Sequence, residues 1–459
     1  MKALFKNIGP VKDAELTLSD LTIIAGSNNT GKTWLAYTLY GSLKMFRESL
    51  TLMQRNRELP FDIPQAAKKI RDSGRVEFHI ENFDKVVQSL FSFSSDAIST
   101  IFSASSDRFK GSEIRLGIDD LAMARGRLEN QIVFSPAGPN GGDDAHLSAS
   151  FENKRLSFSL KEYDLPIKSS VLEQMIFFVF RGLFEKNLPK PFILSAERLG
   201  ISLFYKELDF AKNRLVEIFQ KLKESGLKDI DSFFMLMEDA SSTYAQPVKD
   251  NIDYTRSLEF VQKKSSAAGD EKLFGTIKDM MEGYFKYEEG GIRFISKARK
   301  KGKFNIPLHL ASSSARGLSD LYFFLKHVAQ KDHLLIIDEP ESHLSTANQI
   351  EMARLLARCV NSGLKVLITT HSDYIIKEFN NLIMLGGDFS GKEAFLKKYS
   401  GCYGKDDYLK QESMAAYISE KGSLTPCDVD GLGLNIPHFD ETIDQINAIS
   451  NELALSVEL

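Results

Sequence analysis

The stretch Gly26-Ser27-Asn28-Asn29-Thr30-Gly31-Lys32-Thr33 follows the apolar run Leu21–Ala25 and precedes Trp34–Tyr40, which favours a helix. It fits the pattern G-x-x-x-x-G-K-[ST] in the strand–loop–helix setting that this pattern requires. Gly26 and Gly31 permit backbone turns that a side chain would obstruct, so successive N–H groups face phosphate oxygens. The following helix adds the positive end of its dipole. The sequence therefore predicts a loop that binds a nucleoside triphosphate; the alternative is a Gly/Asn-rich turn that binds nothing.

The pattern gives each residue of this loop a role. The backbone of its middle part surrounds the phosphates, Lys32 reaches the β- and γ-phosphates, and the Thr33 hydroxyl binds Mg²⁺. The expected cofactors are therefore ATP and Mg²⁺. The cofactor-binding residues that we expect here are Asn28, Asn29, Thr30, Gly31, Lys32 and Thr33.

Composition narrows the class of protein. The chain has 459 residues, enough for two to three domains or for one ATPase core with a large insertion. A net charge of −4 gives no general reason to expect nucleic-acid binding. The basic stretch Lys297–Lys303 is read as a solvated hairpin tip, with contact to a phosphate backbone as the alternative. DNA is thus not indicated by charge.

Targeting signals and cysteine pairs are not expected. The start Met1–Asn7 lacks the apolar core of a signal peptide, and no run approaches about 18 apolar residues. Cys359, Cys402 and Cys427 are widely spaced, which indicates neither a disulfide framework nor a zinc site. We expect a cytoplasmic protein without membrane contact.

The stretch His333–Pro340 is an apolar strand that ends in the two carboxylates Asp338 and Glu339. Continuous hydrophobicity is typical of a central parallel strand, and ligands of α/β sheets bind at the carboxyl ends of such strands. Asp338 is expected to be the partner of Mg²⁺, and Glu339 to orient and polarise the attacking water. The alternative is a strand end with a solvated acidic pair.

A second apolar strand, Lys365–Thr370, is followed by His371. Because neighbouring parallel strands end at the same edge of a sheet, we expect His371 near the two carboxylates, where it senses the γ-phosphate. The alternative is a polar residue with no role beyond its hydrogen bonds.

The segment Leu310–Asp320 contains three successive serines before the expected helix Leu318–Gln330. A Ser/Gly turn at a helix N-terminus is a phosphate-binding device. We expect it to act across a dimer; the alternative is an ordinary serine N-cap.

The ordered set of these motifs resembles the ABC-type ATPases of the Rad50/RecF/SMC-like class, and within it the single-chain ATPases of bacterial anti-phage systems. The resemblance rests on the loop 26–33, the serine-rich signature, Ile336–Ser345 and Thr370–Ser372. Phe5–Pro10 and Ser195–Arg198 are typical of the same group. The ATPase subunits of the PARIS and Septu systems are similar in size and plan.

The resemblance implies an α/β fold: an ABC-type P-loop ATPase head with a mixed N-terminal sheet, a parallel core sheet and a mainly helical insertion. It also implies a homodimer or higher homo-oligomer, with ATP between one subunit's P-loop and the other's signature. Ser314 and Gly317 are the signature candidates, and Glu341–Ser345 is the loop that crosses the interface. The signature differs from Leu-Ser-Gly-Gly-Gln, so which serine contacts phosphate stays open; Glu197-Arg198 stands in for the usual metal-contacting glutamine.

Four segments are expected along the chain. They are ATPase lobe I with a β-rich insertion (1–200), a helical insertion (201–288), ATPase lobe II (289–390) and a C-terminal helical extension (391–459). The extension has one apolar face, which packs on its own domain or binds a partner. That face consists of Ile443, Ile446, Ile449, Leu453 and Val457.

The resemblance further implies a function. It indicates an ATP-hydrolysing sensor or scaffold of an anti-phage defence system that responds to a phage protein and controls a separately encoded effector, a nuclease or other toxin. The first alternative is a Rad50/RecF-like ATPase for DNA repair or DNA-end binding. The second is the ATPase subunit of a transporter.

Overall fold

The computed structural model describes residues 1–56, 59–81, 88, 90–117, 127–134, 145–161, 167–185, 188–205, 244–263, 271–288, 290–297 and 304–456. The chain divides into two compact units. The first unit comprises Met1–Leu4, Gly41–Ser94 and Glu113–Lys190; the second comprises Phe5–Tyr40, Ser95–Ser112 and Pro191–Leu459. None of the helices in the described part of the chain is long and apolar enough to cross a membrane.

A large mixed sheet forms the centre of the second unit. Strands β14, β15, β3 and β16 lie next to one another and run parallel, while β17 is antiparallel to β16. Eight neighbouring strands of this ten-stranded sheet are, in order, β10 (Lys190–Leu194), β14 (His333–Asp338), β15 (Lys365–Thr370), β3 (Leu21–Ala25), β16 (Met414–Glu420), β17 (Ser423–Cys427), β2 (Val11–Thr17) and β1 (Lys2–Ile8). The predicted α/β class is confirmed.

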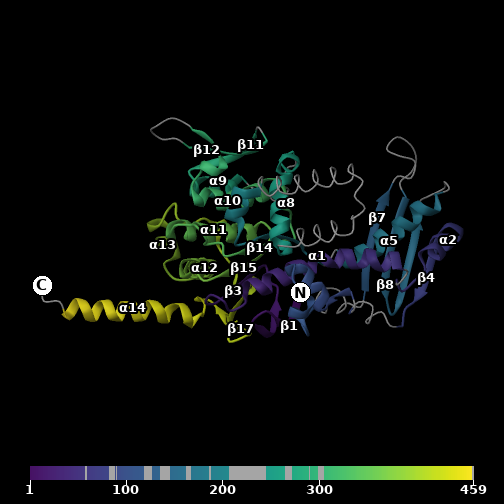
Figure 1. The fold of residues 1–459 in the computed structure, drawn as a ribbon, viewed down its shortest axis with the longest axis horizontal. Coiled ribbons are helices and arrows are strands. Elements are labelled where there is room, and N and C mark those ends of the chain that lie inside the picture. Colours follow the sequence, from purple (N-terminus) through teal and green to yellow (C-terminus); the bar gives the residue numbers. More distant parts are fainter. Residues whose placement is uncertain are drawn as a thin grey trace, which may run out of the picture. The chain divides into compact units, whose positions relative to one another are not determined.

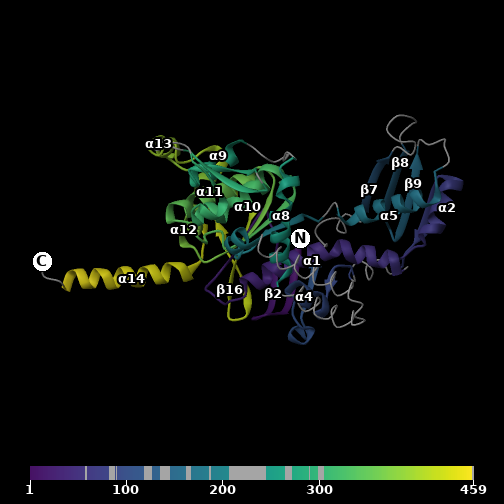
Figure 2. The same ribbon diagram turned by 45° about the horizontal axis from the view of Figure 1, so that its top comes forward.

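Three helices pack with this sheet in one hydrophobic core. They are α10 (Ser313–His327), α11 (Thr346–Asn361) and α12 (Asp373–Gly386), gathered around β14 and β15 in Figures 1 and 2. Each begins after a serine whose hydroxyl accepts a hydrogen bond from the first turn: Ser312, Ser345 and Ser372. The predicted strands 333–338 and 365–370 are confirmed, and their inner residues are almost fully buried.

The insertion before residue 288 contains a strand where only helix was expected. Alongside α8 (Gln246–Val261) and α9 (Glu271–Met280), the strand β11 (Gly283–Glu288) pairs with β12 (Gly291–Ser296), which pairs with β13 (Asn305–Pro307). The buried Phe285 in β11 packs against Phe294, and Tyr284, Phe285 and Tyr287 are residue types that favour strands. The predicted helical segment 206–243 and the basic stretch from 298 to 303 lie outside the described residues.

The predicted helical extension after residue 391 is partly wrong. Helices α13 (Lys392–Lys398) and α14 (Pro437–Ser456) are present, but β16 and β17 between them belong to the central sheet. Strand β16 lies directly beside the P-loop strand β3, with Ile418 opposite Ala25. Two of its seven residues are alanines and it ends in Ser419 and Glu420, so its apolar signal is weaker than that of the strands before Asp338 and His371. A small hairpin of β18 (Val429–Asp430) and β19 (Gly433–Leu434) follows.

The first unit has a four-stranded antiparallel sheet. Its order is β4 (Arg75–His79), β9 (Arg155–Lys161), β8 (Ala145–Glu152) and β7 (Arg127–Phe134), so the insertion in this part of the chain contains strands, as expected. Helices α2 (Ile63–Ser73) and α5 (Ser169–Glu185) pack against it, and β5 (Ser92–Phe93) pairs with β6 (Glu113–Gly117). The ring of Phe61 contacts those of Phe158 and Phe180 in its core.

Candidate functional site

The P-loop borders a cavity of about 510 Å³ in the second unit. It occupies the edge where the parallel strands β3, β14 and β15 end, as the Rossmann-type rule for α/β sheets requires. The lining residues are Pro10, Asn28, Asn29, Thr30, Gly31, Lys32, Thr33, Trp34, Glu339 and His371. The cavity thus brings Glu339 and His371 together with P-loop residues more than 300 positions earlier in the chain.

Two glycines shape the loop. Gly26 has φ +147° and Gly31 has φ +103°, conformations that residues with a side chain rarely adopt. A Cβ atom on Gly26 would lie 2.5 Å from the carbonyl oxygen of Ser419, and one on Gly31 would lie 2.5 Å from Val11 Cγ2. Helix α1 (Lys32–Asn56) begins directly after the loop. The backbone is therefore arranged to present its N–H groups at a helix start.

Lys32 is folded back into the loop. Its Nζ donates to the carbonyl oxygens of Gly26 at 2.8 Å and Ser27 at 2.7 Å, and the residue is 6% exposed. Burial lowers the pKa of Lys32, while the carboxylates of Glu339 and Asp338 act in the opposite direction. A buried cation thus stands at the cavity wall with only neutral carbonyl groups as hydrogen-bond acceptors, ready for an anionic ligand.

Thr33 and Asp338 form the contact that a metal site needs. The Thr33 hydroxyl lies 3.0 and 3.1 Å from the two carboxylate oxygens of Asp338. Asp338 is fully buried, Thr369 also donates to it, and burial raises its pKa to about 6 in spite of these hydrogen bonds. A hydroxyl and a buried carboxylate without a paired cation form the oxygen donor set that Mg²⁺ prefers. These residues therefore fit Mg²⁺.

Glu339 is held in a left-handed conformation at the end of β14. Its φ is +51°, and its N–H donates to the carbonyl oxygen and hydroxyl of Thr369 at 3.1 and 3.2 Å. Its carboxylate accepts a hydrogen bond from the Ser342 hydroxyl at 3.0 Å and lines the cavity. The turn directs this carboxylate toward the phosphate loop.

His371 is held by the buried carboxylate of Glu341, a residue that the sequence analysis placed at a dimer interface. Glu341, 5% exposed, accepts hydrogen bonds from the His371 N–H at 2.7 Å and the Thr370 hydroxyl at 2.9 Å. The same carboxylate lies 3.2 Å from Nδ1 of His371. Glu341 was expected in a loop that crosses a dimer interface, yet its Oε1 bonds to Thr370 and His371 of its own subunit, while its buried Oε2 has no hydrogen-bond partner among the described residues. In the sequence, the sign that Glu341 belongs to the site is its position three residues after Asp338.

Glu197 and Arg198 contact residues next to the cavity but are not part of its lining. The Tyr37 hydroxyl donates to Glu197 at 2.8 Å, whereas Arg198 donates to the backbone carbonyl oxygens of Asp338 and Glu339. Arg198 is therefore a structural partner of the carboxylate strand, and neither residue lines the cavity.

The signature candidates lie apart from this cavity in the single chain. Ser314 is half-buried and donates its hydroxyl to the carbonyl oxygen of His343 at 2.7 Å, and Gly317 is buried within α10. Ser312 and Ser313 are the exposed serines at the start of this helix. The structure does not bring Ser314 and Gly317 to the P-loop, and their expected role across a dimer stays a prediction.

Ser419 is a residue that sequence reasoning missed. Its hydroxyl donates to the carbonyl oxygen of Thr30 at 2.9 Å, and its own carbonyl oxygen faces Gly26. A lone serine in an unrecognised strand carries no signal of this role. The strand β16 thus supports the P-loop from the side.

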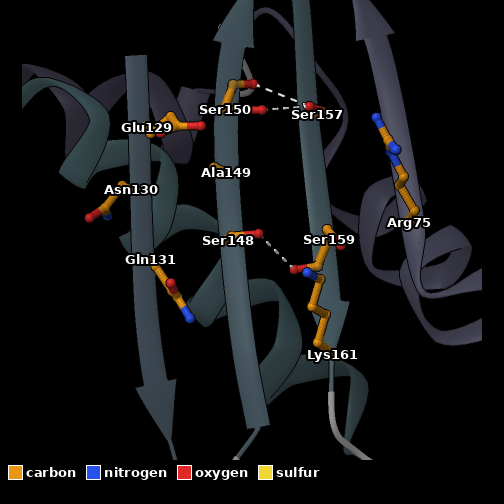
Figure 3. Close-up of a pocket in the computed structure, with 10 residues that line it drawn as sticks. All are labelled: Arg75, Glu129, Asn130, Gln131, Ser148, Ala149, Ser150, Ser157, Ser159 and Lys161. Atoms are coloured by element: carbon orange, nitrogen blue, oxygen red, sulfur yellow. Dashed lines mark hydrogen bonds between the residues drawn. The ribbon is translucent and has the colours of Figure 1, made fainter. Parts of the chain in front are cut away.

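The first unit contains a second cavity, of about 470 Å³, on one face of its four-stranded sheet (Figure 3). Its lining is rich in serine, and these serines bond across the strands: Ser150 with Ser157 at 2.8 Å, and Ser148 with the carbonyl of Ser159 at 3.3 Å. Arg75 and Lys161 stand on its border. None of the residues predicted for the ATP site lies here.

The sequence of the chain is similar to a known protein family and to one curated protein. A family model described as "AAA ATPase domain" matches residues 4–376. Among curated proteins, ABC transporter G family member 21 of Dictyostelium discoideum is 25% identical over 135 residues, or 27% of this chain and 9% of that protein. The chain therefore spans only a small part of that relative.

Solved structures of Smc head domains also align with the chain. One, bound to the C-terminal domain of ScpA and derived from Pyrococcus furiosus, is 13% identical and covers 98% of both chains with a TM-score of 0.33. Another, from Thermotoga maritima, is 12% identical and covers 94% of this chain and 98% of its own with a TM-score of 0.29.

Proposed function

Because the chain belongs to the AAA ATPase domain family, we propose that it binds ATP with Mg²⁺ in the cavity beside Lys32 and hydrolyses ATP to ADP and phosphate. The observation that carries this proposal is the contact between Thr33 and Asp338, which joins the P-loop to the carboxylate strand. The P-loop residues 28–33 surround the phosphates, and Lys32 exchanges the carbonyls of Gly26 and Ser27 for phosphate oxygens.

The remaining side chains then divide the chemistry of hydrolysis. Thr33 and Asp338 hold Mg²⁺, which neutralises charge on the β- and γ-phosphates when bound. Glu339 orients and polarises the attacking water with its carboxylate. His371, held by Glu341, contacts the γ-phosphate and so distinguishes ATP from ADP.

We further propose that two copies close on ATP, with Ser314 and Gly317 of one copy completing the site of the other. The motif resemblance supports this arrangement, and so does the position of the exposed serines at the start of α10, where free N–H groups of a helix end attract phosphate. A Glu339→Gln variant retains ATP, so it should dimerise with Mg-ATP in light scattering, whereas Lys32→Ala should stay monomeric under the same conditions. A monomeric Glu339→Gln protein with bound ATP would contradict the sandwich.

At the level of the cell, we propose a sensor or scaffold of a bacterial anti-phage system that controls a separately encoded effector, with a phage protein as trigger. The set of motifs shared with single-chain defence ATPases supports this role. Both Lys32→Ala and Glu339→Gln should abolish protection of cells against phage. Full protection by both variants would contradict it, and tight, salt-dependent binding of duplex DNA ends with ATP would favour the DNA-repair alternative.

Helix α14 offers a surface for the effector. Ile446, Ile449 and Leu453 lie at spacings of three and four residues and are 59%, 51% and 60% exposed. Such an exposed apolar stripe is typical of a helix that binds in a groove. The helix contains no lysine or arginine, while it has four acidic residues, Asp440, Glu441, Asp444 and Glu452. A second copy of α14 would bring like charges together, so the fitting partner has an apolar groove bordered by lysine or arginine.

The protein encoded by the gene adjacent to this one is the probe for that surface. It should bind the ATP-loaded Glu339→Gln protein, and the added pair Ile446→Asp and Leu453→Asp should weaken binding at least about tenfold. The pair Asn447→Asp and Asn451→Asp, on neighbouring positions of α14, is the control for added charge. Equal binding by all variants would place the contact elsewhere, and a changed oligomeric state of the isolated protein would show that α14 binds a second copy instead.

A further inference from the structure

The conformation of Glu339 requires support from its surroundings. A residue with a side chain at φ +51° is strained, and such strain persists only where neighbouring contacts fix it. The turn nevertheless has to be accurate, because a carboxylate that orients water acts only at a defined position. Contacts to the backbone of Asp338 and Glu339 are therefore the ones that can fix this turn.

Arg198 makes these contacts. Its Nη1 donates to the carbonyl oxygen of Asp338 at 2.8 Å, and its Nη2 donates to that of Glu339 at 2.7 Å. Two parallel bonds from a planar guanidinium to consecutive carbonyls fix both the position and the direction of the peptide between them. Arg198 is 4% exposed, so water does not compete for these bonds.

The base of Arg198 is itself anchored. Its Nη1 also donates to the carbonyl oxygen of Ser195 at 3.2 Å, and the Ser195 N–H donates to Asn251 Oδ1 at 2.8 Å. Asn251 belongs to α8 and donates in turn to the carbonyl of Ile193 in β10. The guanidinium therefore connects the end of β14 to β10 and α8, and these elements fix its position independently of the turn.

We propose that Arg198 is a positioning residue for hydrolysis, which holds the Asp338–Glu339 turn so that the Glu339 carboxylate faces the P-loop. This inference rests on the proposed function of the cavity. Arg198 does not line the cavity, so we expect no direct contact between its side chain and a nucleotide bound there. Its loss should therefore slow the reaction while ATP binding persists, because the P-loop, Lys32 and Thr33 stay in place.

The test compares Arg198→Ala with Arg198→Lys and with Arg354→Ala. Arg354 is a matched control in the same unit: its side chain is 12% exposed and bonds to Glu378 and Glu351, neither of which lines the cavity. In Arg198→Ala we expect kcat to fall at least about thirtyfold while the Kd for ATP stays within about threefold. Arg198→Lys should recover part of kcat, and free guanidinium ion at millimolar concentration should raise kcat of Arg198→Ala but not of Arg354→Ala.

A second measurement does not depend on turnover. Hydrogen exchange in the peptide 334–342 should speed up at least about tenfold in Arg198→Ala relative to Arg354→Ala, because the turn that holds the Glu339 N–H against its acceptor Thr369 is no longer fixed. An equal loss of kcat and ATP binding in both variants, with no guanidinium rescue and equal exchange, would overturn the proposal. If the unaltered protein fails to hydrolyse ATP, the proposed function is wrong, and the exchange experiment alone decides whether Arg198 holds the turn.

Discussion

The Thr33 hydroxyl lies 3.0 Å from Oδ2 of Asp338, although 305 positions separate the two residues. This contact places the first residues of helix α1 at the end of β14, with β15 between β14 and the P-loop strand β3. An oxygen pair at this place is suited to a cation that also contacts phosphate.

Removal of the Thr33 hydroxyl should therefore affect ATP only in the presence of metal. For Thr33→Val we expect the Kd for Mg-ATP to rise about 10- to 100-fold, since one oxygen ligand is lost, while the Kd for ATP in EDTA changes less than about threefold. Isothermal titration calorimetry measures both values. Ser362→Ala, whose hydroxyl bonds only to the Cys359 carbonyl at the end of α11, is the control. Equal weakening with and without magnesium would contradict the metal assignment.

Glu341 should matter for both stability and turnover. Glu341→Ala leaves the buried Thr370 hydroxyl and the partly buried His371 N–H without their acceptor, which costs about 1–3 kcal/mol in free energy of unfolding. It also frees the His371 ring, so kcat should fall about 10-fold or more at nearly unchanged ATP affinity. Glu341→Gln keeps an acceptor oxygen and should retain most of the stability. Unfolding in urea and steady-state kinetics test the two effects separately; full activity in Glu341→Ala would show that His371 needs no such support.

Asp320 should make stability depend on pH. It is 2% exposed in α10, and burial raises its pKa to about 7, against the hydrogen bonds from Thr255 and the charge of Arg198. Because the folded protein holds this proton more tightly than the unfolded chain, the stabilisation is complete below about pH 4 and is lost as pH rises through about 7.

Asp320→Asn removes that titration. The free energy of unfolding of the variant, relative to the unaltered protein, should rise by about 1–4 kcal/mol between pH 4 and pH 8. Thermal or urea unfolding across this range measures the difference. A constant difference between the two proteins would show that Asp320 does not titrate there.

Gly26→Ala should abolish nucleotide binding without unfolding the protein. The new Cβ would lie 2.5 Å from the Ser419 carbonyl oxygen at a φ of +147°, so the P-loop backbone has to shift. We expect the Kd for ATP to rise at least about 100-fold, with a melting temperature within a few degrees of the original, since the change lies in a loop. Gly391→Ala, in an open turn with no atom within 4 Å of the added Cβ, is the control. Normal ATP binding by Gly26→Ala would contradict the rigid loop.

Much of the site followed from sequence because its strands and loop have strong local patterns. The P-loop, the apolar strands before Asp338 and His371, and their common cavity were all predicted. The supporting roles of Arg198, Glu341 and Ser419 were not predicted, and the first two residues were expected in other roles. These roles depend on hydrogen bonds to backbone groups that only the folded chain brings near. Strand β16 was missed because its alanines and its polar end, Ser419-Glu420, give a weak apolar signal, although pairing with β3 settles its place.

The proposal that this cavity hydrolyses ATP, with Glu339 orienting the attacking water, is tested by steady-state ATP hydrolysis with Mg²⁺. The rate is measured for the unaltered protein and for Glu339→Gln. We expect turnover by the unaltered protein, and at least about 100-fold slower turnover by Glu339→Gln with the Kd for ATP changed less than about threefold. Hydrolysis by Glu339→Gln at the rate of the unaltered protein, or no ATP binding by either, would contradict it.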